Sequence, residues 1–70
     1  MLRVEIGKDY VVDYTNYRKE RALRRIRVLG FEFGANEYHP EPELIVLALD
    51  LEREVERTFA ASGIHDVRPG

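Results

Sequence analysis

The stretch of sequence that decides the fold spans residues 22–33 and reads Ala22-Leu23-Arg24-Arg25-Ile26-Arg27-Val28-Leu29-Gly30-Phe31-Glu32-Phe33. The apolar residues of its first half lie roughly on one side of a helix, and they also alternate as the residues of a strand do. Phe31 and Phe33 continue the alternation across Gly30, which favours one long, bent strand with the glycine at a bulge or kink.

Further strands and turns are predicted on both sides of this stretch. Residues 2–6 alternate between apolar and polar side chains, and residues 10–15 are rich in β-branched and aromatic side chains, so both segments are predicted strands. Pro40 and Pro42 exclude a helix interior or a central strand, which makes residues 35–43 a loop. A short final strand is expected at residues 64–67, a tail at residues 68–70, and turns at residues 7–9, 16 and 62–63.

Residues 44–61 fit two different structures. Their apolar side chains recur every three or four residues, and Pro42 with its acidic neighbours suits the start of a helix. Against a helix, residues 44–49 are apolar all round, whereas residues 50–57 are densely charged. A buried strand, a charged turn and a second strand over residues 56–61 explain this abrupt change equally well, so the pattern leaves both structures open.

Length and composition point to one small domain over residues 1–70. The 70 residues include no cysteine, which excludes disulfides and thiolate metal sites. The longest apolar run, residues 44–49, is far shorter than the roughly 20 residues that are needed to cross a bilayer. The N-terminus lacks the basic lead and the apolar core of a secretion signal. We therefore expect a cytoplasmic protein that does not enter a membrane.

Positive charge is concentrated in a basic island at residues 18–27, which holds six Lys or Arg and one Glu in a chain of net charge −2. Clustered cations attract phosphates and carboxylates, and the fork of an arginine can hold two phosphate oxygens at once. The alternative is that these arginines pair with acidic side chains elsewhere on the surface. Because the rest of the chain is acidic, a confined patch for a short single strand of nucleic acid or a small anion fits better than a surface that coats nucleic acid.

Six short motifs follow one another along the chain: Tyr14-Thr15-Asn16-Tyr17-Arg18, Arg24-Arg25-Ile26-Arg27, Phe33-Gly34, Glu37-Tyr38-His39-Pro40-Glu41-Pro42, Ala48-Leu49-Asp50-Leu51 and Arg57-Thr58-Phe59. In this order and spacing the chain resembles WYL domains over residues 10–67, and it is most similar to the short stand-alone WYL-like proteins of bacteria and phages. The resemblance implies a mainly β fold, a small, strongly bent Sm/SH3-like β-barrel of about five strands with little or no helix. It makes residues 22–33 a long bent strand and residues 44–61 a hairpin that turns near residues 52–54.

The resemblance also implies a ligand-sensing function. WYL domains usually belong to bacterial transcription regulators or to nucleic-acid enzymes, and the family pattern implies binding of nucleic acid or another anionic ligand through a basic patch. One arginine of that pattern precedes the bend of a strand, which matches Arg24 or its neighbour Arg25. Another begins an Arg-x-Phe strand, which matches Arg57.

The chain departs from the family pattern at three places. Residues 44–46, Leu-Ile-Val, replace the name-giving Trp-Tyr-Leu, so this strand brings no aromatic stacking surface. Val28 stands where a proline is expected, and Gly63 stands where the family favours arginine near the final strand. These changes are compatible with the barrel fold, but they remove aromatic and basic side chains that the family pattern places at the ligand site.

Aromatic and histidine side chains complete the candidate site. Tyr17 and Tyr38 are expected in loops, where their rings could stack on unpaired bases, although tyrosines of a small barrel more commonly pack on the core. His39 lies among prolines and acidic residues, and neither a metal site nor a general base is expected there, because converging ligands and an orienting partner are missing. The sequence holds no convincing catalytic motif, so we expect a protein that is not an enzyme and needs no cofactor or metal.

The predicted function is a non-catalytic, ligand-sensing module whose basic strand face accepts an anionic ligand, with single-stranded nucleic acid or a nucleotide as candidates. The alternative is a structural or protein-interaction module with an eroded ligand site, which forms a homodimer or binds a larger protein partner through residues 44–49 or the proline loop. The candidate ligand-binding residues are Arg24, Arg25, Arg27, Arg57, Tyr17, Tyr38 and His39.

Overall fold

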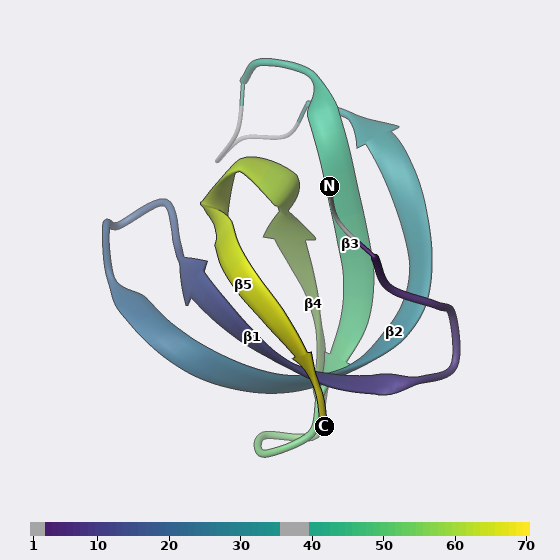
Figure 1. Ribbon diagram of the computed structural model, residues 1–70. Coiled ribbons are helices and arrows are strands. Elements are labelled where there is room, and N and C mark those ends of the chain that lie inside the picture. Colours follow the sequence, from purple (N-terminus) through teal and green to yellow (C-terminus); the bar gives the residue numbers. More distant parts are fainter. Residues whose placement is uncertain (1–2, 36–39) are drawn as a thin grey trace.

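Five β-strands and one short 3₁₀ turn make up the computed structural model, which describes residues 3–35 and 40–70 (Figure 1). All neighbouring strands are antiparallel and lie in one sheet with the order β4-β3-β2-β1-β5. The predicted mainly β fold of about five strands with almost no helix is confirmed. The sheet is strongly bent but is not closed into a barrel, since no pairing joins the edge strands β4 and β5 within the described ranges. The elements are β1 (Asp9–Thr15), β2 (Arg21–Gly34), β3 (Glu43–Asp50), β4 (Val55–Ala60), η1 (Ala61–Gly63) and β5 (Ile64–Pro69).

Strand β2 carries the bend of the sheet. Its residues 21–27 pair with β1 along one edge, and its residues 26–34 pair with β3 along the other edge. The register with β3 shifts between Val28 and Gly30, at the position where the glycine predicted a bulge. The predicted long, bent strand is therefore confirmed.

Residues 44–61 form a hairpin, and the helix alternative is wrong. Strand β3 pairs with β2 on one side and with β4 on the other, and the chain turns between them at residues 51–54. Ile45 and Val46 are neighbours that point to opposite faces of the sheet, yet both are buried. The run of apolar residues therefore reflects a central strand that is covered on both faces.

The hydrophobic core fills the inside of the bent sheet. Tyr14 of β1 links this core to a strand that is not its neighbour, because its hydroxyl accepts the backbone N–H of Ala60 at 3.1 Å. Its ring also meets the ring of Phe59 edge-on, with 4.9 Å between the ring centroids. A side chain of β1 thus holds β4 across the core. The side chains of the buried cluster are Val12, Tyr14, Ile26, Val28, Val46, Ala48 and Phe59.

The N-terminal segment differs from its sequence prediction. Residues 3–5 lie outside any strand, and the chain turns at residues 6–7, so the predicted strand over residues 2–6 is wrong for its described part. The chain turns back here, where the N–H of Lys8 donates to the carbonyl of Glu5 at 3.3 Å, and it joins the edge of β2 only from residues 7–8 onward. The N–H of Gly7 donates to the carbonyl of Val28 at 2.7 Å, and the N–H of Val28 donates to the carbonyl of Lys8 at 3.0 Å.

The C-terminal strand is longer than predicted. Strand β5 continues beyond residue 67 to Pro69, and the N–H of Gly70 donates to the carbonyl of Asp9 at 3.0 Å. The expected tail is therefore paired with β1 for most of its length.

The proline loop is described only in part. Residues 35 and 40–42 lie outside strands and helices, as predicted, whereas Tyr38 and His39 lie outside the described residues. Across the described ranges, the structure has no helix whose length and apolar character would let it span a membrane.

Gly63 lies where two segments of the chain come too close for a side chain. A Cβ at this position would lie 2.5 Å from the carbonyl oxygen of Thr15 and 2.7 Å from Cε1 of Tyr14. This close approach leaves no room for the basic side chain that the family pattern favours here.

We expect Gly63→Ala to lower the free energy of unfolding by about 1–3 kcal/mol, because backbone atoms would have to move to admit the methyl group. Gly34→Ala is the matched control, since a Cβ at Gly34 meets no atom of residues 3–35 and 40–70 within 4 Å. The control should change the unfolding free energy by no more than about 0.5 kcal/mol. Urea unfolding followed by circular dichroism measures both variants. Equal stability of the two variants would contradict the close approach.

Candidate anion-binding site

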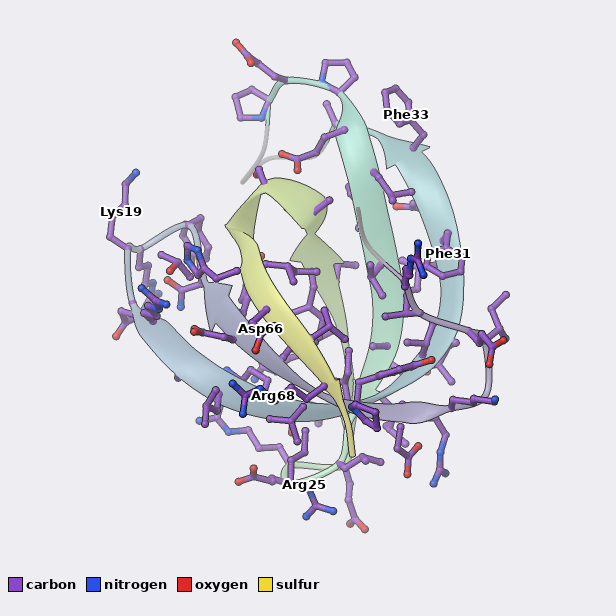
Figure 2. All side chains as sticks on the ribbon, in the orientation of Figure 1. Lys19, Arg25, Phe31, Phe33, Asp66 and Arg68 are labelled. Atoms are coloured by element: carbon purple, nitrogen blue, oxygen red, sulfur yellow. The ribbon has the colours of Figure 1, made fainter. Side chains whose placement is uncertain are left out.

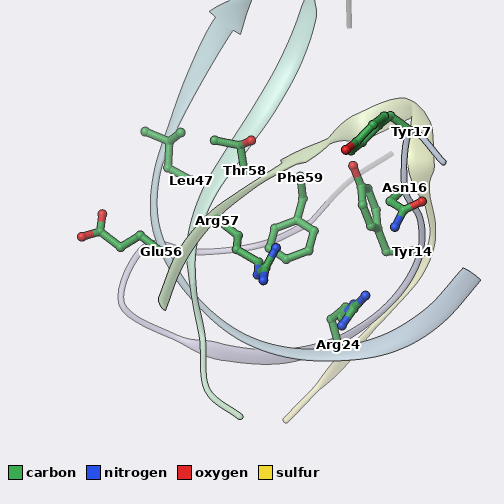
Figure 3. A pocket seen from close by; sticks show the side chains of 9 residues that line it. All are labelled: Tyr14, Asn16, Tyr17, Arg24, Leu47, Glu56, Arg57, Thr58 and Phe59. Atoms are coloured by element: carbon green, nitrogen blue, oxygen red, sulfur yellow. The ribbon is translucent and has the colours of Figure 1, made fainter. Parts of the chain in front are cut away.

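A pocket of about 490 Å³ opens between the end of β1, the first half of β2 and the edge strand β4 (Figure 3). Arginine and aromatic side chains gather around its hollow, whereas Glu56 points away from it. The pocket is lined by Tyr14, Asn16, Tyr17, Arg24, Leu47, Glu56, Arg57, Thr58 and Phe59.

Strand pairing explains why two distant arginines face the same pocket. Arg24 of β2 lies opposite Val12, which is buried, so its side chain starts on the inner face of the sheet. Arg57 of β4 lies opposite Ala48, which is also buried, so it starts on the same inner face. The bend of the sheet then turns β4 toward the first half of β2.

The two arginines differ in their contacts with the rest of the protein. Within residues 3–35 and 40–70, the side chain of Arg24 makes no hydrogen bond or ion pair, although the residue is partly buried. Nε of Arg57 lies 3.6 Å from Oδ2 of Asp50, whose side chain is 3 % exposed. The pocket therefore contains one arginine without a described carboxylate partner and one arginine beside a buried carboxylate.

Aromatic rings line the same pocket as these two arginines. Burial raises the pKa of the Tyr14 hydroxyl above its ordinary value. Tyr17 is about half exposed, and the guanidinium of Arg18 lies over its ring at 5.5 Å from the ring centroid. Nε of Arg18 also donates to the Tyr17 hydroxyl at 3.1 Å. One ring face of Tyr17 is therefore occupied by a cation of the same turn.

Asn16 holds the turn that carries Tyr17. Its side-chain oxygen accepts the N–H groups of Arg18 and Glu20 at 2.9 and 3.0 Å, and its backbone N–H donates to the carbonyl of Glu20. Lys19 adopts a φ of +67° in this turn, a conformation that side chains other than glycine adopt at a cost. The prediction that Asn16 begins a turn is confirmed.

The basic island is divided between the two faces of β2. Arg25 and Arg27 alternate along β2 with the inward-facing Arg24 and Ile26, so both point to the outer face. Figure 2 shows Arg25 on the outside of the bent sheet. Arg27 holds Asp9 with two hydrogen bonds, at 2.8 and 3.2 Å. Arg25 and Arg27 thus do not join Arg24 and Arg57 in lining the pocket.

A second outer pair completes this division. Arg21 holds Asp13 with two hydrogen bonds of 2.9 and 2.8 Å. The outer arginines at residues 21 and 27 therefore follow the alternative that the sequence left open, in which surface arginines pair with acidic residues.

Several pocket residues were not foreseen from the sequence. Thr58 and Asn16 contribute polar groups, and Asp50 lies behind Arg57. The inward position of Arg24 had a signal, since it shares the alternation of Ile26 and Val28. Across the parts of the chain that the structure describes, no three acidic or histidine side chains gather as a metal site would require.

Comparison of the chain with protein-family models, with curated protein sequences and with solved structures finds no match.

The outer ion pairs predict how stability depends on pH. Hydrogen bonds from Arg27 and Arg21 lower the pKa values of Asp9 and Asp13 in the folded protein. A carboxyl with a lowered folded pKa stabilises the protein above its unfolded pKa of about 3.9, and this stabilisation is lost as the pH falls through the folded pKa. The unfolding free energy should therefore decrease below about pH 5.

We expect Asp13→Asn to make this decrease shallower, by a small amount because the pair is exposed. Arg21→Gln removes the other partner and should have the same effect on the slope. Urea unfolding at a series of pH values between about 7 and 2 measures both. A slope that is unchanged in both variants would show that the pair does not form in solution.

Proposed function

We propose that the protein is a non-catalytic, WYL-like binding module whose pocket accepts an anionic ligand, with single-stranded nucleic acid or a nucleotide as the first candidates. The observation that carries this proposal is the placement of Arg24 and Arg57, which reach one pocket from two strands that are not neighbours. Cations that are brought together in this way raise the local potential and attract anions.

The unsatisfied hydrogen-bond donors of the two arginines favour a phosphate group. Arg24 has no side-chain acceptor in the described part of the chain, and Arg57 contacts Asp50 through Nε. The terminal nitrogens of both guanidinium groups could then hold phosphate oxygens in pairs. An aromatic ring beside such a phosphate suits a nucleotide, because bases stack on aromatic side chains at roughly 1–3 kcal/mol per base.

The fold supports the family part of the proposal. The strand order and the bent β2 are those that a small, open Sm/SH3-like barrel would have, and the bond from Tyr14 to Ala60 spans its open side. Ile45 and Val46 stand in the name-giving motif and are buried, so β3 offers no aromatic ring to a ligand. With no side chain at Gly63, we propose that the pocket takes a short or small anion through two arginines.

The test is binding of a fluorescein-labelled oligothymidylate of about eight nucleotides, measured by anisotropy at a series of salt concentrations. Two phosphate contacts on a single strand predict that log K falls with log salt with a slope of about −1.4. Arg24→Ala and Arg57→Ala should each weaken binding at low salt by about fivefold or more, which corresponds to roughly 1 kcal/mol.

Arg25→Ala is the matched control, because it removes the same charge from the outer face of the same strand. It should weaken binding by less than about twofold at moderate salt, where distant charges are screened. Equal losses in all three variants would indicate attraction by net charge alone. If neither the oligonucleotide nor a labelled nucleotide binds the wild-type protein at low salt, the proposal is wrong.

A second candidate function, the interaction module, is favoured by exposed aromatic residues. Phe31 and Phe33 of β2 are 40 % and 74 % exposed. The expected contact through residues 44–49 is not supported, since β3 is paired along both edges and largely buried. If the protein dimerises, Phe33→Asp should produce a monomer in sedimentation equilibrium. A wild-type protein that stays monomeric at all concentrations would exclude self-association.

A further inference from the structure

A buried carboxylate lies directly behind one of the two pocket arginines. Asp50 is the last residue of β3 and is 2 % exposed. Its Oδ1 accepts the N–H groups of Glu52 and Arg53 at 3.0 and 3.1 Å, so this oxygen is committed to the turn at residues 51–54. Its Oδ2 faces Nε of Arg57 at 3.6 Å.

A buried carboxylate needs a nearby positive charge, because burial of an unpaired charge is costly. In the described part of the chain, Arg57 is the cation that forms an ion pair with Asp50. The distance of 3.6 Å is longer than the 2.7–2.9 Å that is typical of a charge-assisted hydrogen bond. The attraction therefore restrains the Nε end of the guanidinium without engaging the whole fork.

The contact at Nε has a consequence for the rest of the guanidinium. Within the described ranges, no acceptor is bonded to the terminal nitrogens of Arg57. The group also lines the pocket, as does Phe59 (Figure 3). Asp50 thus attracts the guanidinium from the turn side while its terminal nitrogens stay available to the pocket.

We propose that Asp50 is the positioning residue for Arg57, and that it sets the orientation in which this arginine meets an anion. This inference rests on the proposed function of the pocket. Arg24 has no equivalent carboxylate among the described residues, so the effect of Asp50 is specific to one of the two cations.

The substitution Asp50→Asn distinguishes the effect of orienting Arg57 from the effect of a negative charge near the pocket. The asparagine oxygen can still accept both turn N–H groups, but its amide N–H₂ would face the N–H of Arg57, donor against donor. Removal of a negative charge near the pocket would by itself tighten anion binding. Loss of the orientation of Arg57 would weaken it. The two explanations therefore predict changes of opposite sign.

We expect Asp50→Asn to weaken binding of the labelled oligothymidylate by about three- to tenfold at low salt, corresponding to roughly 0.7–1.4 kcal/mol. In an Arg57→Gln background the same substitution should change binding by less than about twofold, because residues that act through one another are not additive. Asp66→Asn is the matched control, since it makes the same charge change on strand β5 and outside the pocket. The control should change binding by less than about twofold.

A ligand-free measurement tests the inference independently. In nitrogen-15 NMR spectra of the wild-type protein, the Nε–H of Arg57 should exchange with water more slowly than that of Arg24. In Asp50→Asn this difference should disappear. This comparison in the wild-type protein needs no variant, so it remains decisive if Asp50→Asn does not fold.

The outcomes separate the two proposals. If the wild-type protein binds no oligonucleotide or nucleotide, the proposed function fails, and the NMR comparison alone decides on Asp50. If the wild-type protein binds and Asp50→Asn binds more tightly, or weakens equally with and without Arg57, the positioning role is wrong. Equal exchange rates for Arg57 and Arg24 in the wild-type protein would also overturn it.

Discussion

Strand β2 pairs with β1 along one edge and with β3 along the other, and the rest of the structure depends on the bend between these two pairings. Its residues 21–27 pair with β1 and its residues 26–34 pair with β3, so the two pairings overlap at Ile26 and Arg27. The bulge that follows shifts the register and allows the strand to curve. Because of that curve the inner face of β4 turns back toward the first half of β2, and a pocket forms between strands that share no backbone hydrogen bond.

The same strand separates two populations of arginine. Consecutive side chains of a strand point to opposite faces, so Arg24 turns inward while Arg25 turns outward. On the outer face, Asp9 neutralises Arg27 through two hydrogen bonds, whereas inward Arg24 meets no carboxylate in the described part of the chain. A partly buried guanidinium without a partner is costly to maintain, and a ligand anion would relieve that cost. The electrostatics of the site therefore follow from strand alternation and from where the aspartates lie.

Alternation along β2 was sufficient to favour one long strand with a bulge at Gly30. The expectation that Arg24, Arg25 and Arg27 share one face was wrong, because alternation places Arg24 on the inner face and the other two on the outer face. The hairpin over residues 44–61 could not be chosen from pattern alone, because its apolar spacing suits a helix as well as a strand. Residues 44–50 form a strand because β3 pairs with β2 along one edge and with β4 along the other. The pairing with β2 joins residues far apart in the sequence, which a local pattern does not show. The alternation of residues 2–6 likewise predicted a strand, but residues 3–5 lie outside any strand and the chain turns at residues 6–7. The role inferred for Asp50 depends on turn hydrogen bonds and on a cross-strand neighbour, which a linear sequence does not display.

Strand β4 pairs with β3 along one edge and has no strand partner along the other within the described ranges. Edge strands of this kind invite aggregation, and charged side chains that stand on them oppose it. Glu56 and Arg57 are exposed charged residues on this edge strand, so the arginine proposed to hold a ligand would also act as a gatekeeper against intermolecular sheet growth. Replacement of Arg57 by an apolar residue would thus promote aggregation through the free edge of β4. A polar replacement would remove the proposed ligand contact and still oppose this aggregation.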